Sequence, residues 1–333
     1  MKPLLSALND IPEYRSLLAA IDNGACPAAF SGLSAVHRAY FAAGVRRYQE
    51  RPVVVVCADE GEGERLARDL ESLTGQRVPV LAPRSYIFHN AATVSRQWEH
   101  RRLALMRAMA AGEVPLLVAA VEGLLQRTLP PEELDRAWAE LRTGGSYDLN
   151  QLAETLTAAG YSRCDQVEGV GQFALRGGIL DVYSPGMEQP VRAEFFGDEL
   201  DAMGLFDPAT QRRTENVERA VLLPAAEALP HLAPGGTAGL AARLEKLAAG
   251  AEKAGRHELV QTLRQDREAL VQGRSFPATD RYLALIYPQL ATAADYLPPD
   301  ACVLFSESSR VGERAKTYQW QLEEDAKSLM ERG

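Results

Sequence analysis

A candidate for nucleotide chemistry is the segment of residues 30–38, Phe-Ser-Gly-Leu-Ser-Ala-Val-His-Arg, which follows a short apolar run and opens a predicted helix. A phosphate-binding loop has this position and needs Gly-rich backbone amides, a Lys on the β- and γ-phosphates and a Ser or Thr hydroxyl on Mg²⁺. Gly32 and Ser34 are present, but the Lys and its following Ser or Thr are missing. His37 cannot supply a permanent flexible ammonium, and the guanidinium of Arg38 has a different geometry. The segment therefore predicts a nucleotide site that has lost its function.

Other chemical motifs are weak. Residues 169–174 match a dinucleotide-binding fingerprint, but a predicted strand follows where a helix is required, so this interpretation is rejected. His89 and His100 flank a turn–helix junction without a carboxylate at ligand spacing, and no metal site is expected. No Ser-His-Asp or Cys-His signature stands out. We predict neither a resident cofactor nor a catalytic residue in this chain.

The formal charge of −9 argues against broad non-specific DNA binding, which depends on Lys and Arg neutralising phosphates. The 4 cysteines are scattered without CxxC spacing, which suits a reducing cytosol and provides no zinc framework. Apolar runs such as residues 53–56 are too short to cross a bilayer, and the N-terminus lacks a long apolar signal core. We expect a soluble, cytoplasmic protein without a membrane partner.

Residues 1–142 predict an α/β domain, because helical patterns alternate with short apolar strands. The strands are expected at residues 27–30, 53–57, 78–81 and 116–121, and the helices at 4–21, 40–48, 62–73, 94–111 and 121–126.

Residues 143–224 predict a second, α+β domain that begins at the linker Thr143-Gly-Gly and the helix 149–159. Short strands follow between residues 179 and 206, with apolar and charged residues alternating from 191 to 196. The pattern favours a small antiparallel sheet with one solvent-exposed face.

Residues 225–333 are predicted to be mostly helical up to residue 272, with a further helix at 280–290, a strand at 302–305 and a charged surface helix at 311–332. The late strand has no sheet of its own, so we expect it to return to the first sheet. The middle domain would then be an insertion.

The amino-acid sequences of two segments can be compared directly with a known family. Residues 176–186, Arg-Gly-Gly-Ile-Leu-Asp-Val-Tyr-Ser-Pro-Gly, and residues 190–203, Pro-Val-Arg-Ala-Glu-Phe-Phe-Gly-Asp-Glu-Leu-Asp-Ala-Met, closely resemble the inserted domain 2 shared by UvrB and the transcription-repair coupling factors of the Mfd family. The resemblance implies a degenerate helicase-like (RecA-like) parallel-sheet domain, an inserted α+β domain and a helical return segment, as in UvrB domains 1a, 2 and 1b. In this family domain 2 docks the damage-recognition protein UvrA.

Two further features resemble the Mfd family more than UvrB. Residues 296–309 resemble the UvrB strand that ends in an Asp-Glu pair, but Ser306 stands where the metal-holding Asp would be, while Glu307 remains. In the family register, His37 lies near the position of the P-loop Lys and its following hydroxyl residue. Residues 82–90 run directly to Ser95-Arg-Gln-Trp and leave no room for the aromatic DNA-threading hairpin of UvrB. The resemblance thus implies an N-terminal Mfd-like module with a degenerate nucleotide site.

The resemblance also implies contact residues for UvrA. Arg163 and Arg176 match Arg positions that contact UvrA in UvrB, whereas Ala174 stands where UvrB has another Arg. Phe173 is included as a candidate contact, although core packing is the simpler interpretation. An alternative for each Arg is an ion pair within its own sheet, for example with Glu194 or Asp198.

We therefore expect a monomeric module that binds UvrA and recruits nucleotide excision repair to stalled RNA polymerase. Family members are much longer, and the ATP- and Mg²⁺-dependent DNA translocase motor and the RNA-polymerase-binding domain of the parent would lie outside this sequence. Contacts with RNA polymerase and DNA would be made by those domains. The alternative is a divergent UvrB-type ATPase that loads onto DNA.

Overall fold

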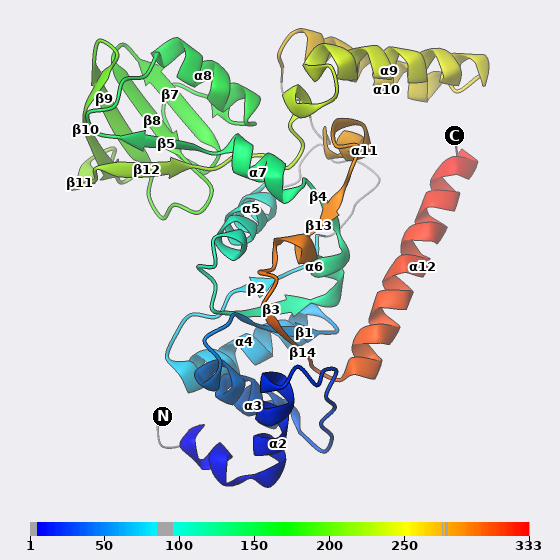
Figure 1. Ribbon diagram of the computed structural model, residues 1–333. Helices are drawn as coiled ribbons and strands as arrows, with labels where there is room; N and C mark the ends of the chain where they lie inside the picture. The colour runs from blue at the N-terminus through cyan, green and yellow to red at the C-terminus, as the bar shows by residue number, and fades with distance from the viewer. Residues whose placement is uncertain (1–4, 85–95, 275, 277–278, 333) are drawn as a thin grey trace. The chain divides into compact units, whose positions relative to one another are not determined.

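The structure is a computed structural model that describes residues 5–84, 96–274, 276 and 279–332 (Figure 1). The chain forms two compact units. The first unit comprises Met1–Ser85, Ala108–Gln126 and Tyr296–Arg332, and the second comprises Tyr86–Arg107 and Arg127–Asp295. The two segments of the second unit thus alternate along the sequence with the three segments of the first. The predicted division at residues 142 and 224 stays a prediction, because this two-way partition does not test it.

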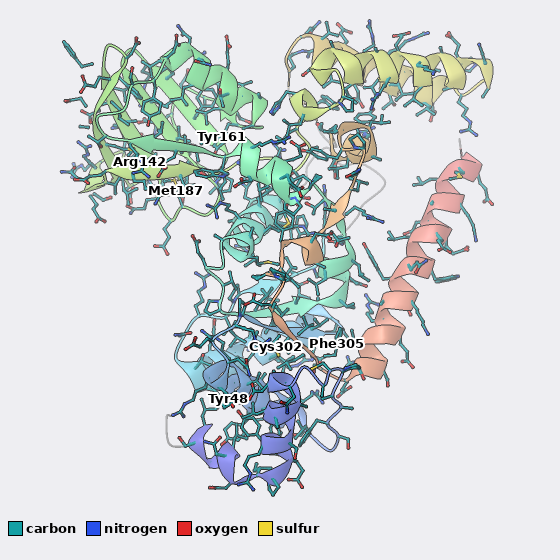
Figure 2. All side chains as sticks on the ribbon, in the orientation of Figure 1. Tyr48, Arg142, Tyr161, Met187, Cys302 and Phe305 are labelled. Carbon is teal, nitrogen blue, oxygen red and sulfur yellow. The ribbon has the colours of Figure 1, made fainter. Side chains whose placement is uncertain are left out.

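A four-stranded parallel sheet forms the centre of the first unit, in the order β14-β1-β3-β2. Its strands are β1 (Val53–Cys57), β2 (Val80–Leu81), β3 (Leu116–Ala120) and β14 (Cys302–Phe305). Every residue of β1 and β3 is buried, as continuous apolar runs predict for parallel strands covered on both faces. The register from Val53↔Cys302 to Val56↔Phe305 confirms the predicted return of the late strand; Figure 2 labels Cys302 and Phe305 on it.

Helices α3 (Ala35–Tyr48), α4 (Glu60–Thr74) and α6 (Val121–Leu125) pack next to this sheet. The helices η1 (Ala7–Asp10) and α2 (Pro12–Asp22) add Leu8, Tyr14 and Leu18 to the same core. The last helix, α12 (Ser308–Arg332), follows β14, and its main contact is with α6. Leu66 and Leu70 of α4 pack in one core with Val55 and Val118 of the sheet. α4 begins where the Asp59 carboxylate accepts a hydrogen bond from the Glu62 amide at 2.8 Å, a standard N-cap.

One expected strand is wrong. Residues 27–30 form no strand, and all four are exposed. Pro27 has no amide hydrogen to donate to a ladder, and the alanines that follow bury little apolar surface. The chain therefore enters α3 through an irregular segment rather than from a strand of the sheet.

The second unit contains a six-stranded sheet in the order β11-β10-β9-β8-β7-β6, antiparallel except for the β6–β7 pair. Its strands are β6 (Ser162–Arg163), β7 (Gln172–Arg176), β8 (Ile179–Tyr183), β9 (Val191–Phe196), β10 (Glu199–Phe206) and β11 (Arg213–Asn216). The predicted antiparallel sheet is confirmed. Figure 1 shows it in green beside α8 (Leu149–Ala158).

The two faces of this sheet differ. Leu152 and Leu156 of α8 pack with Phe173, Leu180 and Val191 on what we call the inner face. Because side chains alternate along a strand, the outer face carries the other set. The outer face consists of Ala174, Arg176, Ile179, Asp181, Arg192, Glu194 and Phe196 on β7, β8 and β9.

The rest of the second unit is mainly helical. Its elements are α5 (Gln97–Ala110), β4 (Arg127–Thr128), α7 (Pro131–Ala137), β5 (Ala139–Arg142), β12 (Arg219–Leu222), η2 (Pro230–Leu232), α9 (Gly236–Lys253), α10 (His257–Val271), η3 (Thr279–Tyr282), α11 (Leu283–Ile286), β13 (Ala291–Thr292) and η4 (Ala293–Tyr296). The helix expected at 280–290 is shorter because Pro288 forces the preceding Tyr287 into an extended conformation. In the parts of the chain that the structure describes, no helix has both the length and the hydrophobicity to cross a membrane.

Candidate docking face and degenerate nucleotide site

The residues of the predicted nucleotide site meet at the start of α3 and the end of β14. Gly32 adopts a φ of 83°, and both it and Ser34 are exposed. Ser34 Oγ lies 3.0 Å from His37 Nδ1. The only cationic side chain of the motif that reaches the sheet edge is Arg38, which donates to Glu307 Oε1 at 2.6 Å. This ion pair joins two residues, Arg38 and Glu307, that are 269 positions apart in the sequence.

The carboxylates at this site form hydrogen bonds and ion pairs with other residues of the same chain. Glu62, nearly buried, accepts a hydrogen bond from Ser306 Oγ at 2.8 Å and lies 3.7 Å from Arg38. Arg310, on the first turn of α12, lies 2.9 Å from Asp59 and 3.7 Å from Glu62. We call this set, Arg38, Asp59, Glu62, Ser306, Glu307 and Arg310, the ion-pair cluster.

The ion-pair cluster has a clear chemical consequence. Its two guanidinium groups lie among three carboxylates, so the charges largely cancel without an added cation. Within the described ranges, no group of three or more His, Cys, Asp or Glu residues could hold a metal ion. His100 lies away from this cluster, with Nε2 3.0 Å from the Ala225 carbonyl, and His89 lies outside the described residues.

On the outer face of the six-stranded sheet, a buried carboxylate joins two arginines. Asp181 is fully buried and accepts from Arg176 Nη2 at 2.6 Å, and from Arg192 Nε and Nη2 at 2.7 and 2.8 Å. These bonds raise the pKa of the Arg192 guanidinium. Arg192 also lies over the Phe206 ring, 4.6 Å from its centroid. The ion pair within the sheet that the sequence left open for Arg176 is thus present, with Asp181 rather than Glu194, which pairs with Arg213.

Arg163 and Arg176 line one shallow pocket of ≈ 310 Å³ together with Cys164, Asp165 and Leu175. Arg163 is exposed on the edge strand β6, and no hydrogen bond or ion pair joins it to another described residue. The Arg176 side chain is 49% exposed despite its bond to Asp181. The structure therefore brings these two predicted contact residues together in one pocket.

The prediction of Phe173 as a contact residue is wrong. Its side chain is 0% exposed and packs on the inner face with Leu180 and Val191. Residues along β7 alternate between faces, so Phe173 cannot share the outer face with Arg176.

The sequence interpretation missed part of the outer face. Phe196 is 86% exposed and Ile179, which is paired with Arg176, is 37% exposed, and both add apolar surface to the outer face. The signal was present in the alternation along β9, because Phe195 packs in the inner core and Phe196 must then point outward. Two adjacent aromatic residues on one strand cannot both be buried by a single layer of core.

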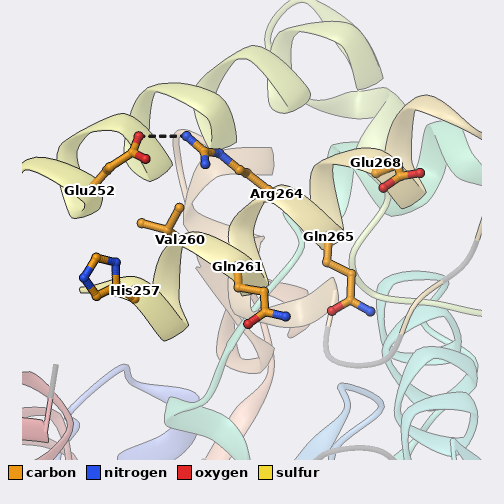
Figure 3. A pocket seen from close by; sticks show the side chains of 7 residues that line it. All are labelled: Glu252, His257, Val260, Gln261, Arg264, Gln265 and Glu268. Atoms are coloured by element: carbon orange, nitrogen blue, oxygen red, sulfur yellow. Dashed lines mark hydrogen bonds and ion pairs between the residues drawn. The ribbon is translucent and has the colours of Figure 1, made fainter. Parts of the chain in front are cut away.

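A second hollow, of ≈ 570 Å³, lies along α9 and α10 (Figure 3). Glu252 and Arg264 form an ion pair of 2.8 Å across it, and His257 and Val260 line the end nearer α9's C-terminus. It contains none of the predicted site residues.

Comparison with known proteins gives two findings. The family described as the UvrB interaction domain matches residues 139–227, which include the whole six-stranded sheet. The transcription-repair-coupling factor of Bacillus subtilis is 28% identical over 341 residues, covering 100% of this chain and 29% of that protein. The factor of Myxococcus xanthus is 33% identical over 60% of this chain and 17% of its own length, and that of Escherichia coli 32% identical over 53% and 15%. The chain spans less than a third of the length of these relatives.

Proposed function

We propose, on the premise that this chain resembles the N-terminal, UvrB-like module of the transcription-repair coupling factor Mfd, that it docks UvrA through the outer face of its six-stranded sheet and the adjoining pocket at the β6–β7 edge. In the parent protein this docking would recruit nucleotide excision repair to stalled RNA polymerase. The motor that moves on DNA, with its ATP and Mg²⁺, would belong to other parts of such a parent. A cytoplasmic, monomeric module remains our expectation.

One observation carries the proposal. Arg163 and Arg176 line the same pocket within the region that matches the UvrB interaction domain. Arg is enriched among residues that dominate binding energy, because its planar fork can pair with two oxygens of a carboxylate. The exposed ring of Phe196 supplies the apolar surface that usually accompanies such anchors.

The test is a titration of UvrA against the wild-type chain, Arg176→Ala and Arg163→Glu. Arg176→Ala is preferable to a charge reversal, because Glu at this position would place a second carboxylate beside buried Asp181. We expect losses of affinity above about tenfold for Arg176→Ala and smaller losses for Arg163→Glu. Arg142→Glu is the matched control, since Arg142 is exposed in the same domain but lies on β5, in a different sheet. A wild-type chain that fails to bind UvrA would overturn the proposal.

We also propose that this chain does not turn over ATP, which is supported by the ion-pair cluster. Phosphoryl transfer needs charge neutralisation on the phosphates and a placed metal ion. Here Arg38 is engaged with Glu307, and Ser306, at the position where the resemblance to UvrB implies a metal-holding Asp, donates to Glu62. Calorimetry with Mg²⁺-ATP should detect no binding. Micromolar binding, with turnover that is lost in Arg38→Ala, would instead favour a divergent UvrB-type ATPase.

A further inference from the structure

Asp181 has an unusual position for a carboxylate in the middle of a sheet. It lies on β8 between Ala174 of β7 and Arg192 of β9, and its side chain is 0% exposed. A buried carboxylate is costly unless charge-assisted hydrogen bonds satisfy it. Arg192 meets most of that need with bonds to both carboxylate oxygens at 2.7 and 2.8 Å.

Arg176 makes a different kind of bond with the same carboxylate. Its Nη2 donates to Oδ2 at 2.6 Å, while 49% of its side chain stays exposed. Within the described residues, this is the one hydrogen bond of its side chain, so most of the N–H groups of its fork remain available. A free Arg on the surface loses rotamer entropy when a partner immobilises it. An Arg that is already held loses less.

We propose that Asp181 is a positioning residue for the docking face: it holds the Arg176 guanidinium in the orientation that receives a carboxylate-bearing surface of the partner. This inference rests on the proposed function, since it concerns the same face. Arg192, which neutralises Asp181, leaves a net positive charge in the group of three. Together with unpaired Arg163 in the adjoining pocket, this charge favours acidic groups on the partner.

For the variant Asp181→Asn, positioning and net charge predict opposite changes in the affinity for UvrA. Asp181→Asn removes the negative charge beside the Arg176 and Arg192 guanidinium groups, which by charge alone should strengthen binding to an acidic partner. Positioning predicts that it weakens UvrA binding by about three- to tenfold, because Arg176 must then be ordered on docking. Asp165→Asn gives the charge-only comparison: Asp165 is exposed in the docking pocket and has no hydrogen bond to Arg176 among the described residues. Losing its negative charge should raise the affinity for an acidic partner.

A mutant cycle separates positioning from a general loss of structure. In an Arg176→Ala background, Asp181→Asn should have no further effect on UvrA affinity, since it acts through Arg176. A full additional loss in that background, or stronger binding by Asp181→Asn alone, would overturn the positioning role. If Arg176→Ala and Arg163→Glu weaken binding while Asp181→Asn does not, docking stands and positioning fails.

A measurement on the wild-type chain keeps the proposal testable if Asp181→Asn does not fold. Arginine side-chain NMR should show restricted motion and slowed proton exchange for the Arg176 guanidinium, and fast motion for that of Arg163. Equal mobility of the two groups would overturn the proposal whether or not UvrA binds.

Discussion

Glu227 is a buried carboxylate that joins distant segments of the second unit. It lies 3.3 Å from Arg102 of α5, with both side chains only 2% exposed, and accepts from Thr128 Oγ1 at 2.8 Å. Its own amide donates to Glu99 at 2.7 Å. Removing one partner of such a pair leaves a buried charge without compensation.

Glu227→Gln should therefore destabilise the second unit by about 3–5 kcal/mol, even though the amide can still bond Thr128. The measurement is urea unfolding followed by tryptophan fluorescence in a Trp320→Phe background, where the remaining Trp98 and Trp138 both lie in the second unit. Glu133→Gln, on a partly exposed i,i+3 pair with Arg136, should shift stability by no more than about 0.5 kcal/mol. Equal effects of the two changes would show that burial of the pair is not decisive.

His100 makes the stability of the second unit sensitive to acid. Burial is the main cause that lowers the pKa of its imidazole below the ordinary value of 6.5, and Nε2 lies 3.0 Å from the Ala225 carbonyl. The unfolded chain then binds the proton more tightly than the folded chain, so stability is fully present above pH 6.5 and falls as the pH drops below it. Burial also lowers the pKa of His231.

We expect the urea midpoint of the second unit to fall between pH 7.5 and about 5.5, and this fall to be smaller in His100→Gln, where the amide can still donate to Ala225. His257→Gln, at an exposed helix start, is the control and should keep the wild-type pH dependence. An unchanged slope in His100→Gln would assign the acid sensitivity to other groups.

At the scale of elements, α12 depends on ion pairs at its N-terminal end. Arg310 pairs with Asp59 at 2.9 Å and Arg314 with Glu122 of α6 at 2.6 Å, while Val311 is buried between them in sequence. Further along, Trp320 and Met330 are exposed. The predicted surface helix is confirmed, but its first turns are attached by charge more than by apolar area.

Arg310→Gln combined with Arg314→Gln should raise amide hydrogen exchange through the first turns of α12, and salt should have the same effect on the wild type. Exchange in α8, which packs by apolar contacts, should not change. Lys327→Gln, which breaks an exposed i,i+3 pair with Glu324, serves as the control and should leave the exchange pattern intact. Unaltered exchange in the double variant would mean that Val311 alone holds the helix.

The elements that could be predicted from the sequence are those with strong local patterns. The apolar runs of β1 and β3 and the isolated run of β14 sufficed to predict a parallel sheet that the late strand joins. The strand expected at residues 27–30 failed because its alanines offer little surface to bury, and only tertiary context decides such short runs. In the candidate site, Arg163 and Arg176 were predicted as contact residues from the resemblance to UvrB. Their shared pocket depends on the pairing of β6 with β7. The partnership of Asp181 with two arginines depends on strand register, which spacing alone does not reveal.

At the scale of the whole molecule, charge bears on the partner that the chain prefers. The net charge of −9 sets a repulsive field toward nucleic acid, so the net positive group of Arg176, Asp181 and Arg192 is a local exception suited to an acidic protein surface. Binding to duplex DNA at physiological salt should accordingly be weak or absent, because few counterions would be released. Fluorescence anisotropy with a labelled duplex over a range of salt concentrations measures this DNA affinity.

The double variant Arg163→Glu with Arg176→Ala distinguishes a protein partner from a nucleic-acid partner. It should abolish UvrA binding and leave the low DNA affinity unchanged. Sub-micromolar duplex affinity with a steep salt dependence, lost in that variant, would mean that the outer face is a nucleic-acid surface instead.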